Sequence, residues 1–328
     1  MGAVRAWVGR RVGEMGFNAG GGPINWFPGH MAAATRAIRD RLKLSDLVIE
    51  VRDARIPLSS VNEDLQSVLS SKRRVIALNK KDLANPNIMH RWIRHFESCK
   101  QDCISISAHN RNSVQKEKIK RATVGPLPGV TQDIAGYKIA HRPSIYVLDT
   151  PGVLVPCIPN IETGLKLALT GAVKDSVVGE DRLAQYLLAI LNTRSTPLHW
   201  KYLDNRRMEG SQCESENKND DLFRDSLPRK KKLLNESDVR HIENLIAEVQ
   251  RTLYATFLEF DGDLEDESDL ESLIEKQFMG LQKAFRIPKK AGDDARTMIS
   301  KKLLTLFRIG KLGPFTLDNV PNTRDPIA

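Results

Sequence analysis

The stretch Val75-Ile76-Ala77-Leu78-Asn79-Lys80-Lys81-Asp82 decides the fold class of this 328-residue chain. Its first half is apolar and β-branched, as expected of a buried strand, and its polar second half begins where that strand should end. Runs of the same character recur along the first half of the chain, and together they cover residues 47–52, 74–78, 103–107 and 144–148. Each run is followed by a loop that contains Asp, Asn, Gly or Pro, which favours a strand that stops at that point.

Helical stretches lie between several of the expected strands, for example at residues 32–44 and 86–97. Strands that alternate with helices predict an α/β fold with a parallel sheet. Ligands of such sheets bind at the carboxyl ends of the strands. The polar residues that follow each strand are therefore the first candidates for a functional site.

Polar segments stand at the carboxyl ends of the last three expected strands. The second strand is followed by Asn79-Lys80-Lys81-Asp82, the third by Ser107-Ala108, and the fourth by Asp149-Thr150-Pro151-Gly152. Each of these matches is weak by itself, but an Asn-Lys-x-Asp and an Asp-x-x-Gly at the ends of strands are more specific together than apart.

The order of these segments resembles that of the circularly permuted GTPases. In ordinary GTPases Asp-x-x-Gly precedes Asn-Lys-x-Asp, whereas here the two occur in the opposite order. Further segments resemble motifs of the same family, and they are Trp26-Phe27-Pro28-Gly29-His30-Met31 (its N-terminal signature), Asp53-Ala54-Arg55 (its DAR motif) and Pro128-Gly129-Val130-Thr131 (its switch). The resemblance runs from residue 24 to about residue 320 and is to the ribosome-assembly GTPases of the mitochondrial DAR type.

The resemblance implies a role in guanine recognition for the first two segments. Asp82 would accept hydrogen bonds from N1 and the 2-amino group of guanine. Asn79 would brace the loop and the base, and Lys80, followed by Lys81, would pack its stem along the ring. The loop at Ser107 and Ala108 would offer a backbone N–H to guanine O6.

The resemblance also implies a phosphate and Mg²⁺ site, with GTP or GDP as the nucleotide. Asp149 would hold Mg²⁺ through water, Thr131 would bind Mg²⁺, and the segment Thr150-Pro151-Gly152 would bring a glycine N–H to the γ-phosphate. The next residue is Val153, where ordinary GTPases carry a glutamine that orients water. An apolar side chain cannot orient water, so His30 becomes the catalytic candidate, with packing against the G domain as the alternative role.

One family motif is absent, because the sequence contains no Gly-x-x-x-x-Gly-Lys-[Ser/Thr] phosphate-binding loop. The one Gly-Lys pair, Gly310-Lys311, is followed by Leu312 and lies far from the other motifs. Only residues 109–130 separate Ala108 from Thr131, and they are too few for a strand, loop and helix, which form part of a unit of about 30 residues or more. The sequence therefore suggests an internal deletion between Gln115 and Arg121, which would weaken the binding of GTP and Mg²⁺ and leave the parallel sheet incomplete.

The second half of the chain has a helical character. Apolar residues recur at helical spacing in 180–192, 239–258, 270–285 and 295–307, whereas residues 203–235 are polar and indicate a flexible insert. We therefore expect a targeting segment at 1–23, a circularly permuted G domain without its phosphate-binding loop at 24–178, and a helical domain that contacts RNA or the ribosome at 179–328.

The net charge of +9 indicates a polyanionic partner. The resemblance makes that partner the large ribosomal subunit and its rRNA. No apolar run approaches the roughly 18 residues that a membrane span needs, so no span is predicted. Peripheral association with the inner membrane stays open, and the sequence does not predict the oligomeric state.

The first residues carry Arg5, Arg10 and Arg11 against a single acid, Glu14. An arginine-rich start that is poor in acids is typical of mitochondrial and plastid transit peptides. We expect the mitochondrial matrix as the location, with a plastid or the cytoplasm as alternatives. A glycine-rich tail without a targeting role would have a similar composition.

The four cysteines argue against a disulfide scaffold in a chain of this length. His95, Cys99 and Cys103 would share one helix face and could in principle bind a metal, but there is no Cys-x-x-Cys and no clear fourth ligand beyond His90. A structural role is the favoured interpretation.

Three functions remain open at this point. The first is a GTP-hydrolysing assembly factor, the second is a protein that binds rRNA without hydrolysing GTP, and the third is an inactive isoform. The presence or absence of a phosphate-binding segment in a longer transcript would distinguish them.

Overall fold

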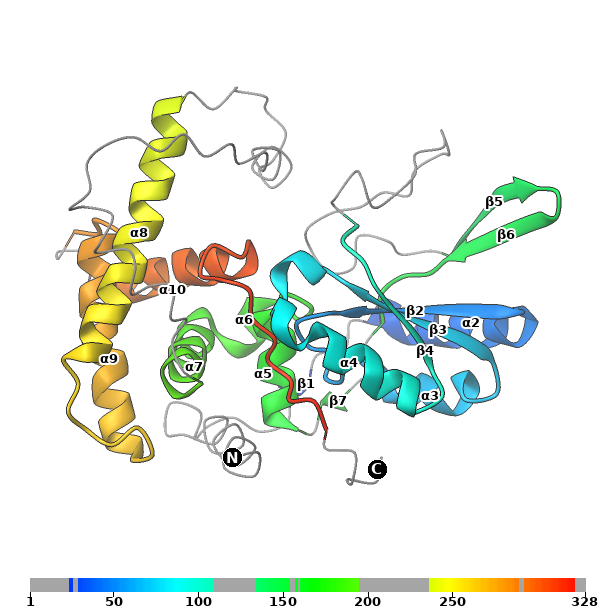
Figure 1. Cartoon of the computed structure of the whole chain (residues 1–328), viewed down its shortest axis with the longest axis horizontal. Coiled ribbons are helices and arrows are strands. Elements are labelled where there is room, and N and C mark those ends of the chain that lie inside the picture. The colour runs from blue at the N-terminus through cyan, green and yellow to red at the C-terminus, as the bar shows by residue number, and fades with distance from the viewer. Residues whose placement is uncertain are drawn as a thin grey trace. The chain divides into compact units, whose positions relative to one another are not determined.

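The computed structural model describes residues 24–25, 29–108, 134–153, 157–158, 160–194, 236–288 and 292–321. The chain divides into two compact units, one formed by residues 1–190 and 300–328 and the other by residues 191–299. The elements run in the order β1 (Ile24–Asn25), α2 (Gly29–Leu44), β2 (Leu47–Asp53), α3 (Glu63–Leu69), β3 (Arg73–Asn79), the 3-10 turn η2 (Lys81–Leu83), α4 (Pro86–Ser98), β4 (Asp102–Ser105), β5 (Ala135–His141), β6 (Ser144–Asp149), β7 (Cys157–Ile158), α5 (Ile161–Leu169), α6 (Asp175–Val178), α7 (Glu180–Thr193), α8 (Glu236–Leu258), α9 (Glu267–Ala284) and α10 (Asp293–Arg308) (Figure 1).

A parallel sheet of three strands, in the order β2-β3-β4, organises the first unit. The register pairs Leu47 with Arg73 at one end and Asp53 with Asn79 at the other. On the far side of β3, Val75 pairs with Asp102 and Leu78 pairs with Ser105. The expected α/β fold with a parallel sheet is confirmed, and the carboxyl ends of the three strands meet at one edge.

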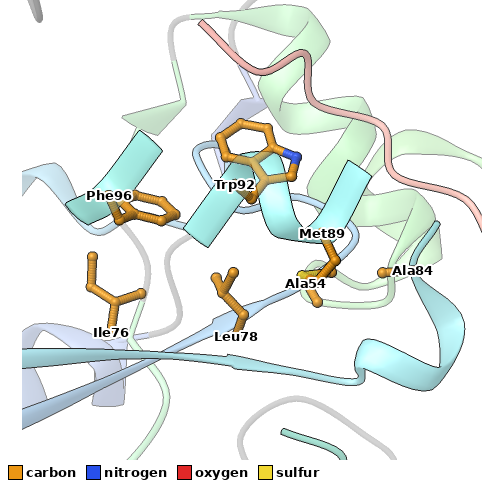
Figure 2. Packing of buried hydrophobic residues seen from close by; sticks show 7 residues of the cluster. All are labelled: Ala54, Ile76, Leu78, Ala84, Met89, Trp92 and Phe96. Atoms are coloured by element: carbon orange, nitrogen blue, oxygen red, sulfur yellow. The ribbon is translucent and has the colours of Figure 1, made fainter. Parts of the chain in front are cut away.

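Helix α4 covers one face of this sheet. Pro86 occupies its first turn and the Asn85 side chain accepts a hydrogen bond from the Asn87 N–H, so the sequence defines where the helix begins. Its buried side chains Met89, Trp92 and Phe96 pack against Ile76 and Leu78 of β3, as Figure 2 shows. This packing fixes the strand that carries Asn79.

The opposite face of the sheet is exposed and apolar. Side chains alternate along a strand, so Leu47, Ile49 and Val51 of β2 share a face, and the pairing places Ile104 of β4 on the same face. Their exposed fractions are 47%, 59%, 62% and 49%. Parallel sheets are normally covered on both faces, so this half of the fold has lost or never acquired its cover.

The fourth apolar run does not join the parallel sheet, and the expectation of a buried strand there is wrong. Residues 144–149 form β6, which pairs antiparallel with β5 in a separate two-stranded sheet (Figure 1). Ile145, Tyr146 and Leu148 are between 43% and 65% exposed. An apolar run alone does not show whether another layer covers it, and a nearby strand with a short turn forms an antiparallel pair readily.

The expected helices of the second half are confirmed as α7, α8, α9 and α10. In the second unit α8 packs along α9, and a Cβ at Gly280 of α9 would lie 2.6 Å from Cγ2 of Thr252, so only glycine permits this approach. Asn192 and Gln277 exchange two buried side-chain hydrogen bonds of 2.9 Å within the same unit. The expected insert at 203–235 lies outside the described residues.

No helix in the described ranges is both long enough and apolar enough to cross a membrane.

Candidate functional site

The carboxyl ends of β2, β3 and β4 bring together three of the segments singled out in the sequence. Asp53 ends β2 and stands beside Asn79, which ends β3. Ser107 and Ala108 follow β4, and the Ile106 N–H donates to the carbonyl oxygen of Leu78 at 2.8 Å. The DAR motif, the Asn-Lys-x-Asp loop and the Ser-Ala loop therefore form one cluster.

The Asn79 carboxamide joins the two candidate base-reading loops. Its Oδ1 accepts hydrogen bonds from the Lys80 N–H at 2.8 Å and from the Ala108 N–H at 3.0 Å. A further bond runs from the Lys81 N–H to the Ile106 carbonyl oxygen at 3.1 Å. Asn79 thus has the bracing geometry expected of it. The Ala108 N–H is already engaged, so guanine O6 would have to share it with Asn79.

Asp82 is held by Ser107 at the mouth of the same cluster. The Ser107 hydroxyl donates to Asp82 Oδ1 at 2.5 Å, while Asp82 itself is exposed and Ser107 is 4% exposed. A short hydrogen bond to a carboxylate is among the stronger ones available to a side chain. One Asp82 oxygen is therefore oriented by the protein, and the carboxylate remains open to a ligand.

Lys80 adopts a left-handed backbone conformation, with φ at 62°. A lysine in this region is strained relative to glycine, so the surrounding contacts must hold it there. One of those contacts is an ion pair, since Lys80 Nζ lies 3.0 Å from Asp53 Oδ2. The DAR motif thereby reaches the base-reading loop directly.

Asp53 and Arg55 form a buried pair within the DAR motif. Arg55 donates Nε to Asp53 Oδ1 at 2.9 Å and Nη2 to Asp53 Oδ2 at 2.7 Å. Burial alone would raise the pKa of Asp53, but the hydrogen bonds and charge of Arg55, with the charge of Lys80, outweigh it and hold the pKa below its ordinary value. Asp53 is therefore a carboxylate over the whole physiological pH range.

Sequence reasoning missed the C-terminal segment that supports this cluster. The Leu317 N–H donates to the Arg55 carbonyl oxygen at 2.7 Å. Asp318 is 5% exposed, and its Oδ2 accepts the N–H groups of Leu58 and Ser59 at 2.8 Å each. Asp318 Oδ1 also accepts from Lys166 Nζ at 3.2 Å. No motif marks Asp318, because its partners lie about 260 residues earlier in the chain.

The candidate phosphate residues are held differently. Asp149 ends β6 opposite Ala135 of β5, Pro151 is buried and Gly152 is exposed. The segment is tied to the sheet unit by the Asn62 side chain, whose Nδ2 donates to the Val153 carbonyl oxygen at 3.1 Å. Within the described residues no hydrogen bond or ion pair joins residues 149–152 to the loops at Asn79 or Ser107. The structure does not assemble the two halves of the expected site into one network.

Two candidate residues cannot be placed by their side chains. His30 lies in the first turn of α2, but its side chain is not among those described, and Thr131 lies outside the described residues. Val153 packs its side chain against the cluster of α2 and α3, which excludes it from any contact with a reacting water. The role of His30 stays a prediction.

A metal site at His95, Cys99 and Cys103 finds no support. His95 packs its ring against Trp92 and Phe96, with centroids 5.8 and 5.4 Å apart, while Cys103 belongs to β4. In the portion of the chain that the structure describes, no group of three His, Cys, Asp or Glu side chains could hold a metal ion. The described residues therefore fit guanine better than they fit Mg²⁺.

Comparison with known proteins identifies relatives across nearly the whole chain. "Short integuments 2, mitochondrial" of Arabidopsis thaliana is 59% identical over 361 positions, covering 95% of this chain and 93% of the relative. "DAR GTPase 2, mitochondrial" of the same plant is 34% identical and covers 98% of this chain and 97% of the relative. "Mitochondrial ribosome-associated GTPase 1" of Bos taurus is 35% identical over 51% of this chain and 65% of its own length.

Among solved structures, a GDP-bound structure of TM YlqF is 17% identical, covers 86% of this chain and 98% of that chain, and has a TM-score of 0.39. No model of a protein family matches the chain. The order of the motifs and the full-length similarity to the two plant proteins agree. The chain therefore belongs to the circularly permuted ribosome-biogenesis GTPases, in the group of the mitochondrial DAR GTPases.

Proposed function

We propose that this chain is a guanine-nucleotide-binding factor for assembly of the mitochondrial large ribosomal subunit, with an intact base-reading half and an incomplete phosphate-binding half. The Asn79 carboxamide carries the proposal, because one oxygen atom holds the loops at Lys80 and Ala108 together. These are the two loops between which guanine would lie. The names of the relatives support a GTPase that works with ribosomes.

In this proposal Asp82 is the residue that reads the base. Its exposed carboxylate accepts N1–H and the 2-amino group of guanine, a pair of donors that adenine does not present. Ser107 fixes one carboxylate oxygen, so less side-chain freedom is lost when the base binds. Lys80 supplies an aliphatic stem that can lie along the ring.

The phosphate half of the site fits its ligand poorly. The chain has no phosphate-binding loop, and Asp149 is the one carboxylate that the described part of the proposed phosphate segment offers to Mg²⁺. The alignment with the 59% identical relative spans 361 positions, 33 more than the 328 residues of this chain, so at least 33 positions of that relative have no counterpart here. This difference supports an internal deletion, and we therefore expect GTP and Mg²⁺ to bind weakly and derive no hydrolysis step for this chain.

A titration tests this proposal. A lengthened version is made by inserting, between Gln115 and Arg121, the residues of the 59% identical relative that have no counterpart here. A fluorescent GTP analogue is then titrated against both proteins. We expect the natural chain to bind at least a hundredfold more weakly, because several charge-assisted hydrogen bonds of about 1.5–3 kcal/mol each exceed the roughly 2.7 kcal/mol of a hundredfold change.

The Asp82→Asn variant of both proteins is the control for base reading. It should reduce guanine binding in each, since an amide cannot accept both guanine donors. Equal affinities of the natural and lengthened chains would show that residues 109–130 supply a phosphate site of their own. Unchanged binding by the Asp82→Asn variants would show that the base lies elsewhere.

A lengthened version also gives His30 a test. We propose that His30 orients the attacking water once a phosphate-binding segment is present, because Val153 is packed away in an apolar cluster. In the lengthened version His30→Ala should slow GTP hydrolysis and leave the affinity for the analogue unchanged. An unchanged hydrolysis rate would remove His30 from the mechanism.

Binding of rRNA without hydrolysis is the second candidate function, favoured by the net charge of +9 and by the helical residues 179–328. Binding that depends on phosphate contacts weakens steeply with salt. Sedimentation of the chain with mitochondrial large subunits at low and high salt measures this. The absence of an association at low salt would argue against any ribosomal role.

The proposed location is the mitochondrial matrix, with residues 1–23 as the targeting segment. The relatives named above support a mitochondrial protein. Fusion of residues 1–30 to a fluorescent reporter tests the segment, and a diffuse cytosolic signal would contradict it.

A further inference from the structure

The DAR motif lies against the base-reading loop, although neither composition nor family order gives it a role there. Asp53 is shared between two cations, since Oδ2 accepts from Arg55 Nη2 at 2.7 Å and from Lys80 Nζ at 3.0 Å. The backbone reinforces the link, because the Ala54 N–H donates to the carbonyl oxygen of Asn79 at 2.8 Å. Two separate contacts therefore join the DAR motif to the loop that begins with Asn79.

Arg55 keeps the Asp53 carboxylate from turning. Its guanidinium binds both carboxylate oxygens, and its Nη2 also donates to the Thr170 carbonyl oxygen at the end of α5 at 3.0 Å. The Asp53 and Arg55 side chains are 13% and 3% exposed. A carboxylate fixed by a bidentate, buried guanidinium presents its remaining hydrogen-bonding capacity in one direction, and that direction is occupied by Lys80.

Lys80 is a side chain for which such fixing matters. Its stem has four rotatable carbon–carbon bonds, and its head is 39% exposed, so without a partner it would sample many conformations. Its left-handed backbone and its ion pair together set where the stem lies. If the stem packs along guanine, as proposed above, the ordering is completed before the base arrives.

We propose that Asp53 is a positioning residue for guanine recognition, which holds Lys80 in the conformation that packs against the base, and that Arg55 in turn holds Asp53. This inference rests on the proposed function, because it assigns the DAR motif a task within the base-reading half of the site. The motif does not touch the ligand in this arrangement. It acts through Lys80.

The first measurement follows Lys80 itself and needs no nucleotide. The folded protein is treated briefly with an amine-modifying reagent, and the labelling of Lys80 and of the neighbouring exposed Lys81 is compared by mass spectrometry. Asp53→Asn keeps the shape of the side chain but removes its charge. It should raise labelling of Lys80 relative to Lys81 by about two- to fivefold, the range expected for loss of a partly exposed ion pair.

Asp318→Asn is the matched control. Asp318 is also a buried carboxylate with a lysine partner and backbone partners, but it does not contact Lys80. It should lower stability without changing the Lys80 to Lys81 ratio. An equal rise in Lys80 labelling in both variants would show general loosening and would overturn the inference.

The second measurement is base selectivity, taken as the ratio of affinities for fluorescent GDP and ADP, in which the phosphates are identical. Asp53→Asn should lower this ratio by a similar two- to fivefold factor if positioning is worth about one ion pair, and Asp318→Asn should not. Labelling that rises without any loss of selectivity would make the contact structural and would overturn the positioning role. If the unaltered chain shows no preference for GDP, the proposed function fails, and the labelling result alone then decides whether Asp53 holds Lys80.

Arg55→Lys covers the case in which Asp53→Asn does not fold. It keeps the buried charge but loses the bidentate contact, so Asp53 can turn and Lys80 labelling should rise by a smaller factor. Unchanged labelling in a folded Arg55→Lys variant would show that Arg55 does not hold Asp53 and would overturn that part of the inference.

Discussion

The base-reading loops and the phosphate segment were expected to serve one nucleotide, yet the structure holds them in different ways. The loops at Asn79 and Ser107 follow adjacent parallel strands and are joined through the Asn79 carboxamide. The segment that begins at Asp149 follows a strand that pairs in a hairpin, with exposed apolar side chains on β6. The first half of the site is braced by its own strands, and the second is not.

The difference teaches where the support for a site comes from. Every partner of Asn79, Lys80 and Asp82 lies on β2, on β3 or just after β4, so these loops remain braced without any further strand. A phosphate cradle is made of backbone N–H groups in a loop between a strand and a helix. Such a cradle disappears completely when its segment is deleted, because no side chain elsewhere can replace it.

Removal of the Trp92 side chain is the change we expect to have the largest effect on the braced half. Trp92 is fully buried between α4 and β3, so Trp92→Ala should lower the free energy of unfolding by about 3–5 kcal/mol. Tyr146→Ala on the exposed hairpin is the comparison, and it should change stability by less than about 1 kcal/mol. Urea unfolding followed by circular dichroism measures both, and equal losses would mean that the hairpin is packed as tightly as the sheet.

Loss of the Asn79 carboxamide should break the braced half more locally. Asn79→Ala leaves the N–H groups of Lys80 and Ala108 without their acceptor, at an expected loss of about 1–3 kcal/mol. Hydrogen exchange at these two amides should accelerate, and the affinity for fluorescent GDP should fall. Asn62→Ala, which frees the Val153 carbonyl oxygen beside the phosphate segment, should leave both amides protected. Faster exchange in the Asn62 variant as well would mean that the two halves are coupled.

The sequence predicted the parts of the fold that depend on local pattern. The run at 74–78 became β3, Arg73–Asn79, and the stretch at 86–97 became α4, Pro86–Ser98, because an apolar period and a proline near the helix start are both local signals. The approach of Asn79 to Ala108 followed from the rule that parallel strands end at one edge.

The same reasoning failed where the outcome depends on partners far away. Residues 144–148 have the composition of a buried strand, but composition does not state which neighbour the strand finds. Nothing near Asp53 in the sequence indicates Lys80 as its partner, and nothing near Asp318 indicates Leu58 and Ser59. Contacts of this kind are determined by three-dimensional pairing, which a single sequence does not display.

Acid should weaken the braced half through Asp53. Its pKa is lower in the folded protein than its ordinary value, so the stabilising contribution is fully present above the unfolded-state pKa of about 3.9 and is lost as the pH falls through the folded-state pKa. The urea midpoint of the unaltered chain should therefore fall below about pH 4, and Asp53→Asn should show a shallower fall. Parallel curves for the two proteins would assign acid sensitivity to other carboxyl groups.

The smallest effect is expected on the uncovered face of the sheet, and it sharpens the comparison most. Ile49 is 59% exposed, so Ile49→Thr, which keeps a β-branched side chain, should change the stability of this chain by no more than about 0.5 kcal/mol. In the lengthened version the inserted residues should cover this face, because a strand and helix added beside β2 pack back onto the sheet. There the same substitution would bury a hydroxyl group and should lower the free energy of unfolding by about 1–3 kcal/mol. Urea unfolding of the four proteins gives the double difference. A large effect of Ile49→Thr in the natural chain would mean that its own residues already cover the face, and equally small effects in both versions would mean that the missing segment packs elsewhere.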